Sequence, residues 1–421
     1  MKFYYSTFFR AALTMAVCLL FFRIGSHTPI PHINKAVFDS LFQSNQSGVL
    51  QLVNIIGGGS LSRMSVFSLS IMPYITASIV IFVAQLMSDK VKEFAASENG
   101  KIKLEQIKRL LTVLLVFTQS MTLSTILLSQ NVNGEPLATV SGFTFYVSTF
   151  LSLLTGTFIV VWLANIMTFV GFGAGTSLII MFGILSSMPS NFFTISSMVS
   201  EGSATVVSVV ALISIVLICF AMVIYFENAG RRVATLKSDK YGGSRPSYVT
   251  FKANPIGMMP PIFAAIVISM FVTTASAFSS LMPDFLVTAK DRLVGGTPEF
   301  IALFSVLTFV FGFALKGTML NPKKVANGLM MSGQVIRSLR VGLETEKYLS
   351  RLFQSLTFIA CCYLVVLCTI PEIVNAYLGI PFYLGGTSIL IMVSTASEMR
   401  KNIFGMMEGN AYKKVSEDFL K

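Results

Sequence analysis

The chain has 421 residues, of which 54% are hydrophobic and only 12% are charged. Soluble domains carry about 25% charged residues, so this composition excludes a water-soluble enzyme and a disordered protein. The five cysteines all lie in apolar stretches, which indicates buried core residues and excludes a disulfide-stapled secreted scaffold. A mean hydropathy of +0.74 is typical of a protein that crosses a membrane several times.

Ten apolar runs follow one another along the chain, and each approaches the roughly 20 residues that cross the hydrocarbon core. We place them at about 11–28, 71–88, 109–129, 142–166, 171–190, 204–226, 258–281, 298–318, 352–370 and 380–399. We do not expect the first run to be a cleaved signal peptide, because no small-residue cleavage site follows it. The sequence therefore predicts an all-α membrane protein with ten transmembrane helices.

Positive charge predicts the orientation of these spans. Lys and Arg number 31 against 19 Asp and Glu, which gives a net charge of +12, and the spans put 26 of the 31 on one side. Cytoplasmic loops of membrane proteins are rich in Lys and Arg, so this side, which includes both termini, is predicted to be cytoplasmic. Orientation explains the charge without direct binding of nucleic acid.

Three long segments are not regular spans: residues 29–70 on the outer side, and two basic, turn-rich loops, 227–257 and 316–351, on the cytoplasmic side. The segments 29–70 and 227–257 each follow the first span of a group of five, and they lie on opposite sides. This arrangement predicts two pseudo-symmetric five-helix halves. The predicted divisions are an N-terminal half (1–200), a C-terminal half (201–399) and a cytoplasmic tail (400–421).

The sequence lacks the phosphate-binding GxxxxGK[ST], metalloprotease HExxH and hydrolase GxSxG motifs. The middle parts of the spans are almost uncharged, whereas ion-coupled transporters usually bury ionisable residues there. We predict no catalytic residue, metal or cofactor, and a passive pore that a partner drives. A small-solute secondary transporter is the main alternative. A membrane-bound acyl or glycosyl transferase is a third hypothesis, for which no convincing His, Asp or Glu cluster is present.

Three segments of the sequence are distinctive: Arg23-Ile24-Gly25 with Pro29-Ile30-Pro31, the stretch from Leu61 to Ser78, and the stretch from Phe382 to Ile391. Together they resemble the SecY family of protein-conducting channels. The resemblance runs from about residue 11 to the C-terminus. It implies a SecY-like clamshell with an hourglass pore, a re-entrant plug, and a lateral gate between spans two and three and spans seven and eight. The implied function is to conduct unfolded, signal-peptide-bearing preproteins across the bacterial plasma membrane and to release apolar segments into lipid.

The family closes its pore with a ring of aliphatic side chains, and the matching positions here are all isoleucine. They are Ile71, Ile75, Ile180, Ile184, Ile262 and Ile391. Ile71 and Ile75, like Ile180 and Ile184, are four residues apart and so share a helix face. An apolar constriction excludes water and ions and can still part around a chain. Without the resemblance, these residues would be expected only to face lipid or core.

The resemblance also implies a plug and a lateral gate. The segment from about 50 to 69 matches the plug, with a hinge at Gly57, Gly58 and Gly59, where backbone freedom is greatest. Gln119 matches a polar gate position, and Gln85 is predicted to face the same region, where an amide seeks a partner on another helix. An ordinary outer loop and a local packing bond are the alternatives.

The two basic loops are where this family docks the SecA motor or the ribosome. The residues predicted to dock a partner are Arg231, Arg232, Lys240, Arg245, Arg337 and Arg340. Arg340 matches a characteristic arginine of the family, and an arginine fork suits acidic surfaces. The alternative is that these residues only set orientation. Small membrane subunits of the SecE and SecG type are implied by the family alone.

The docking face departs from the family pattern Ile-Pro-Gly-Ile-Arg-Pro-Gly. Here Arg337 and Ser338 replace the first Pro-Gly, and Val341 replaces the second proline. Asn165 replaces the family's glutamate near the turn between spans four and five. The pore positions are retained while the docking face differs, which favours an accessory SecY paralogue of a Gram-positive bacterium with a narrow substrate set. A divergent housekeeping SecY is the alternative.

Overall fold

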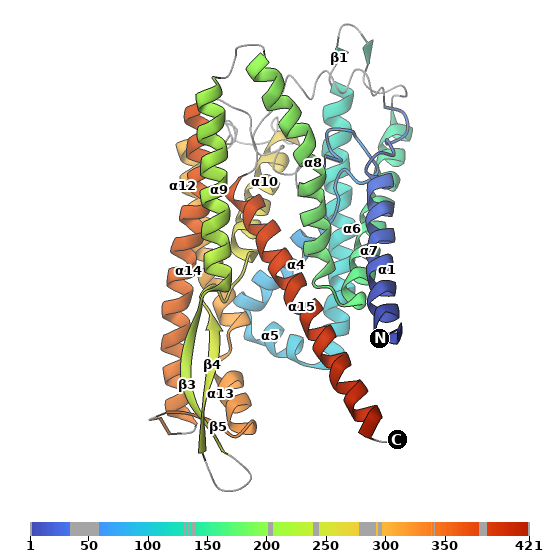
Figure 1. Ribbon diagram of the computed structural model, residues 1–421. Coiled ribbons are helices and arrows are strands. Elements are labelled where there is room, and N and C mark those ends of the chain that lie inside the picture. Colours follow the sequence, from blue (N-terminus) through green and yellow to red (C-terminus); the bar gives the residue numbers. More distant parts are fainter. Residues whose placement is uncertain are drawn as a thin grey trace.

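The structure, a computed structural model, describes residues 2–33, 59–129, 131–132, 135–136, 140, 142–200, 205–238, 244–277, 292–293, 297–337, 339–340, 342–378 and 385–419. Each predicted apolar run coincides with a helix (Figure 1). These helices are α1 (Lys2–Gly25), α4 (Met72–Met87), α6 (Glu98–Ser129), α7 (Phe143–Val170), α8 (Gly175–Ser200), α9 (Val206–Asn228), α10 (Met259–Ala277), α12 (Pro298–Met319), α14 (Leu343–Leu378) and α15 (Gly386–Phe419). Two polar helices, α5 (Asp89–Ala96) and α13 (Pro322–Met331), lie between them.

Local sequence signals define several helix ends. Thr297 caps α12 by accepting a hydrogen bond from the backbone N–H of Phe300, and Asn321 caps α13 by accepting one from that of Lys324. A proline follows each cap, where its missing N–H costs nothing. At the other end, α7 stops at Gly171, whose φ of +89° favours glycine.

The described helices pack as two groups. In the first group, α4, α6, α7 and α8 contact each other in sequence order, and α1 packs on α7. In the second group, the contacts run from α10 through α12, α14 and α15 to α9. In Figure 1, α9, α12 and α14 stand on one side, α1, α6 and α7 on the other, and α4, α10 and α15 lie between. The groups meet where α8 contacts α15 and where α10 contacts α4 and α6.

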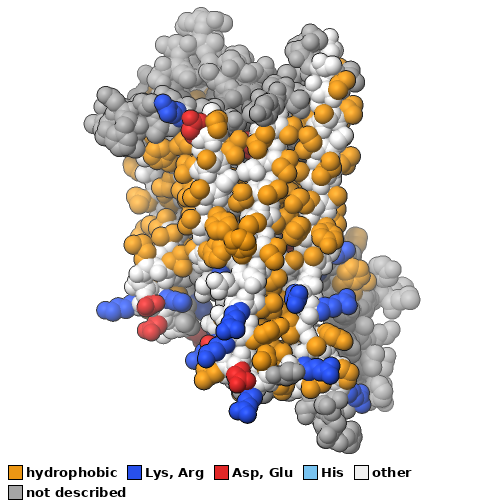
Figure 2. Space-filling model, turned by 90° about the vertical axis from the view of Figure 1, so that its left-hand side faces the viewer, with side chains coloured by type: hydrophobic (Ala, Val, Ile, Leu, Met, Phe, Trp, Pro, Cys, Tyr) orange, Lys and Arg blue, Asp and Glu red, His pale blue; other side chains and the backbone are white. Residues whose placement is uncertain are grey.

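The outer surface is apolar over most of its height. Four of the described helices, α7, α9, α12 and α14, are long and apolar enough to cross a membrane, and α4, α8 and α10 contain shorter apolar stretches. On the face shown in Figure 2, hydrophobic side chains cover the helices, and most Lys and Arg side chains gather at the lower end. Such an apolar band is suited to contact with lipid. The exposed side chains of α9 show the same character, since they include Val207, Leu217 and Ile218.

A three-stranded sheet joins the two basic loops, 227–257 and 316–351. Turns but no strands were predicted there from the sequence. Strands β3 (Gly230–Ser238) and β4 (Ser244–Lys252) form an antiparallel hairpin, and β5 (Gln334–Ile336) pairs with the other edge of β3. The hairpin projects at the end of the molecule where α1 begins and α15 ends (Figure 1). Val233 and Ile336 pack there with Phe353 of α14 in a small apolar cluster. A short second pair, β1 (Asn131–Val132) and β2 (Glu135–Pro136), lies at the opposite end.

Two of the sequence segments that carried the family resemblance contact each other. The backbone N–H of Ile30 donates to the carbonyl of Met64 at 2.8 Å, and that of Val66 donates to the carbonyl of Thr28 at 2.9 Å. A Cβ at Gly25 would lie 2.1 Å from the ring of Phe67, so only glycine admits this ring. The spacing of these motifs therefore has a packing cause.

Candidate functional site

The six predicted ring residues all belong to, or pack against, the main apolar core cluster, which extends through both groups of helices. Ile71 precedes α4 and Ile75 lies in its first turn, and the others lie on α8, α10 and α15. Ile71 and Ile184 are completely buried, Ile180, Ile262 and Ile391 are at most 5% exposed, and Ile75 packs against the cluster while half-buried. The structure thus places all six side chains in the apolar core, where both groups of helices contribute them.

The chain enters the ring through a series of tight turns. Residues 59–71 form successive turns, and Ser70, immediately before Ile71, has a φ of +47°. The hydroxyls of Ser65 and Ser68 both donate to the carbonyl of Ser60, at 3.2 and 3.1 Å. This part of the predicted plug is therefore folded as hydrogen-bonded turns. Of the predicted hinge only Gly59, with a φ of +74°, can be described, because Gly57 and Gly58 lie outside the described residues.

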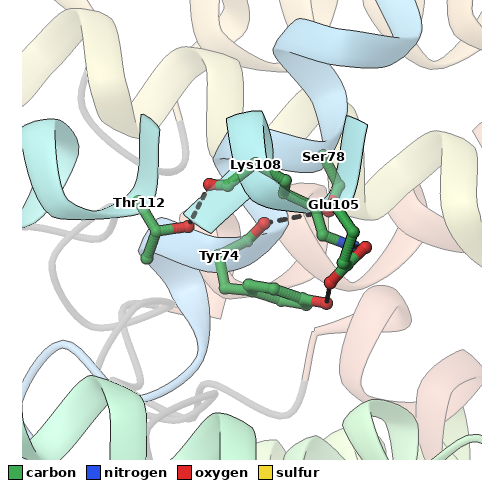
Figure 3. Close-up of polar contacts among 5 residues, drawn as sticks. All are labelled: Tyr74, Ser78, Glu105, Lys108 and Thr112. Carbon is green, nitrogen blue, oxygen red and sulfur yellow. Dashed lines mark hydrogen bonds and ion pairs between the residues drawn. The ribbon is translucent and has the colours of Figure 1, made fainter. Parts of the chain in front are cut away.

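A polar network lies beside the ring, and the sequence reading missed it (Figure 3). The hydroxyl of Tyr74, next to Ile75, donates to Oε1 of Glu105 at 2.8 Å, and Lys108 Nζ lies 2.6 Å from Glu105 Oε2. The same ammonium lies 4.4 Å from the centroid of the Tyr74 ring, within cation–π range. The network therefore ties the start of α4 to α6. Its sequence signal was the opposite charges of Glu105 and Lys108 three residues apart.

The charges of this network stabilise each other. Burial alone would raise the pKa of Glu105, but the hydrogen bonds from Lys108 and Tyr74 outweigh it and hold that pKa below its ordinary value. Burial alone would likewise lower the pKa of Lys108, but its contacts with Glu105 and Tyr74 raise it overall. The carboxylate and the ammonium are therefore both favoured in their charged forms.

One aromatic pair joins two helices of the predicted lateral gate. Phe82 of α4 meets Phe263 of α10 edge to face, with ring centroids 5.9 Å apart. The buried Oε1 of Gln119 has no hydrogen-bond partner in the part of the chain that the structure describes, and Gln85 is half-buried. Both amides lie on helices that contact α10, but the partner predicted for Gln119 is not observed.

The predicted docking residues lie around the sheet. Arg231 and Arg232 lie on β3, Arg245 on β4, Arg337 directly after β5, and Arg340 before α14, and all five are exposed. Lys240 lies outside the described residues.

Two of these arginines are held by their backbones. The N–H of Arg337, just after β5, donates to the carbonyl of Ala234 at 3.2 Å, and a proline at this position could not make this bond. The N–H of Arg340 donates to Oε2 of Glu344 at 3.1 Å, while its carbonyl accepts from the hydroxyl of Thr345.

Within the described ranges, no three His, Cys, Asp or Glu side chains group as metal ligands. The cysteines predicted to be core residues are free, and Cys18, Cys219, Cys361 and Cys368 are buried as predicted. Cys362 is exposed, which corrects the expectation for that residue.

The fold is that of known protein-conducting channels. A solved structure of "a protein conducting channel" has a TM-score of 0.70 at 16% sequence identity, over 93% of this chain and 91% of that chain. The channel of "the Canine ribosome-channel complex from the endoplasmic reticulum" has a TM-score of 0.65 at 16% identity, over 94% of this chain and 91% of that chain.

Sequence comparison identifies the family. The SecY family model matches residues 65–400, and the chain belongs to the SecY family. The "Protein translocase subunit SecY" of Rickettsia typhi is 35% identical over 411 residues, 94% of each chain. That of Escherichia coli K12 is 31% identical over 414 residues, 96% of this chain and 92% of the relative.

Family membership decides between the classes left open by the sequence. The chain is the central pore subunit of a Sec-type protein translocase of a bacterial membrane, and it is a channel rather than an enzyme. The secondary-transporter and transferase hypotheses are therefore wrong.

Proposed function

We propose that the six isoleucines form the constriction of the pore, which stays dry at rest and parts around an unfolded preprotein. The observation that supports this proposal is that all six belong to the apolar core shared by the two packed groups of helices, and that five of them are buried there. An apolar constriction excludes ions by dewetting and has no fixed preference for the side chains that pass.

Site-specific crosslinking tests this role of the ring. A photoreactive residue at Ile184 should crosslink to a stalled secretory preprotein only when its signal peptide is present. The same residue at Leu217, which is 63% exposed on the apolar surface of α9, is the matched control and should give no signal-dependent adduct. Equal adducts at both positions, or none at Ile184 with several preproteins, would contradict the ring assignment.

We further propose that both termini and the sheet face the cytoplasm. The start of α1, the end of α15 and the hairpin lie at the same end of the molecule, which supports placing them on one side of the membrane. The positive charge predicted for this side supports the cytoplasmic side. A cysteine in place of exposed Tyr248 should react with a membrane-impermeant maleimide only in inverted vesicles. Labelling in intact cells would reverse the orientation.

The partners proposed for this face are a SecA-type ATPase motor or a ribosome, with SecE-like and SecG-like subunits beside the helices. One relative in fold is described in a ribosome-channel complex, which supports a ribosome as one kind of partner. The exposed arginines of the sheet and of the turn before α14 are the proposed contacts. Arg340→Glu should abolish driven translocation while membrane insertion of the channel stays normal.

The moving parts of the channel are proposed from the same geometry. The segment of about 50–69 acts as the plug, and α4 and α6 part from α10 and α12 as the lateral gate between the halves 1–200 and 201–399. The contact of Phe82 with Phe263 supports this position for the gate. The arginine in place of the family's proline at position 337, whose N–H bonds to Ala234, supports an accessory channel with a narrow substrate set.

A further inference from the structure

A cleft of about 350 Å³ opens beside the sheet, between β3, the end of β5 and the first turns of α14. Three arginines and five other side chains line it: Arg231, Arg232, Arg337, Val233, Ala234, Ile336, Leu339 and Tyr348. The cleft therefore combines a cationic rim with an apolar floor, of which Val233 and Ile336 are buried.

One wall of the cleft is a stretch of the β3 edge that pairs with no strand in the described part of the chain. Strand β4 accompanies β3 over its whole length, whereas β5 pairs only with Thr235–Lys237 on the other side. The carbonyl of Ala234 points toward β5, because it accepts from Arg337. Alternate residues of a strand direct their backbone groups to the same side, so those of Arg232 point into the cleft beyond the last described pair with β5.

The charge of the cleft selects an anionic ligand. None of the side chains that line it is acidic, and a guanidinium pairs with a carboxylate or a phosphate through parallel hydrogen bonds. The described acids near it in sequence are Glu227, Glu344 and Glu346, and none of them lines the cleft. Oε1 of Glu227 accepts from the hydroxyl of Ser394, and Oε2 of Glu344 accepts from the backbone N–H of Arg340. The three guanidinium groups are thus available to an external partner.

Strand edge and apolar floor distinguish between two anionic partners. A nucleic-acid backbone could use the arginines, but it would leave the aliphatic floor exposed and has no amide groups to extend the sheet. An extended peptide uses all three features, since its backbone adds to the edge and its alternate side chains point to rim and floor.

We propose that this cleft binds an extended acidic peptide segment of a cytoplasmic protein, which adds as a short strand beside Arg232 and places its carboxylates on Arg231, Arg232 and Arg337. The proposal rests on the proposed cytoplasmic orientation of the sheet. It implies that the partner at this part of the face is a protein, for example a motor, and not ribosomal RNA.

Binding to the purified full-length protein in nanodiscs tests the proposal without translocation. The probe is a fluorescein-labelled heptapeptide of alternating Glu and Val, measured by fluorescence anisotropy. Arg232→Gln and Arg337→Gln should each weaken its binding about tenfold. Arg351→Gln, an exposed arginine of the same basic segment outside the cleft, is the matched control and should change binding less than about twofold.

Three further outcomes separate the alternatives. The same peptide with backbone N-methyl groups should lose most of its affinity, because it cannot extend the sheet, and undiminished binding would overturn strand addition. A single-stranded oligouridylate of matched charge should bind more weakly than the peptide. If it binds more tightly than the peptide, and both cleft variants reduce that binding, the cleft is an RNA-binding surface instead. If the peptide does not bind while the Ile184 crosslink forms, this proposal alone fails and the pore assignment stands.

Discussion

The hydroxyl of Ser394 donates a hydrogen bond to Oε1 of Glu227 at 3.2 Å, and this contact joins the last turn of α9 to α15. Glu227 is only 6% exposed. The same junction contains a second contact, from Arg400 Nη2 to Asn228 Oδ1 at 3.1 Å. Since β3 begins at Gly230 and Ile391 lies one turn before Ser394, the junction connects the root of the hairpin to a helix of the predicted ring.

Removing either partner of this contact should destabilise the protein. Ser394→Ala leaves a buried carboxylate without its hydroxyl donor, at a cost of about 1–3 kcal/mol. Glu227→Ala should cost a similar amount, and the double variant should cost at least about 0.5 kcal/mol less than the sum of the two. The measurement is the free energy of unfolding in detergent micelles.

The control for this cycle is Ser214→Ala on the same helix α9. Ser214 is exposed and its hydroxyl bonds within its own helix, to the carbonyl of Val210. Its loss should cost less than about 0.5 kcal/mol. Strict additivity of the Glu227 and Ser394 variants would show that the junction is not energetically coupled.

The ring assignment predicts an ion leak. Ile262→Gly and Ile75→Gly widen the apolar constriction, so water and ions should enter the resting channel. Planar-bilayer recording should show a conductance that the unaltered channel lacks. Ile268→Gly is the matched control, because Ile268 is also buried on α10 but belongs to a different apolar cluster. Background conductance in both ring variants, or an equal leak from the control, would remove these residues from the ring.

Two adjacent glycines should differ sharply in tolerance. A Cβ at Gly386 would lie 2.0 Å from the carbonyl oxygen of Leu367, so Gly386→Ala must push α15 away from α14. A Cβ at Gly385 would meet its nearest neighbour at 3.5 Å, which is an ordinary contact. Gly386→Ala should lower the thermal unfolding midpoint by several degrees more than Gly385→Ala, consistent with overpacking costs of about 1–3 kcal/mol. Equal midpoints would contradict this close packing.

The helices could be predicted from the sequence because each depends on a local apolar run. The ring positions are implied by the resemblance to the SecY family, and helical spacing adds only that Ile71 and Ile75 share a face. The three-stranded sheet could not be predicted in this way, because its third strand, β5, comes from about a hundred residues further along the chain. The local signal in β3 is limited to the burial of Val233 and Thr235 at alternate positions. Contacts between distant segments leave no local pattern, and the contact of Tyr74 with Glu105 was missed for the same reason.

The buried carbonyl oxygen of Gln119, which has no partner among the described residues, should make the closed gate costly. Its Oε1 is buried without a partner among the described residues, so Gln119→Met removes an unsatisfied acceptor and keeps a similar volume. We expect a gain of about 1 kcal/mol in stability and slower signal-dependent crosslinking from Ile184, because the closed gate is favoured. Gln106→Met, on the exposed part of the same helix, is the control and should change neither quantity. Faster crosslinking in Gln119→Met would reverse this role.

Acid should weaken the network of Tyr74, Glu105 and Lys108. The folded pKa of Glu105 lies below its ordinary value, so its stabilisation is complete above that value, about 4.3, and is lost as pH falls through the folded pKa. Because Glu105 is partly exposed, solvent limits the effect to less than about 1 kcal/mol. The thermal midpoint of the unaltered protein should exceed that of Glu105→Gln by a constant margin between pH 7 and 5, and this margin should shrink toward pH 3. Glu93→Gln removes an exposed acid on α5 and is the control. If the difference in midpoint between the unaltered protein and Glu105→Gln does not change with pH, the charge of this carboxylate does not stabilise the contact of α4 with α6.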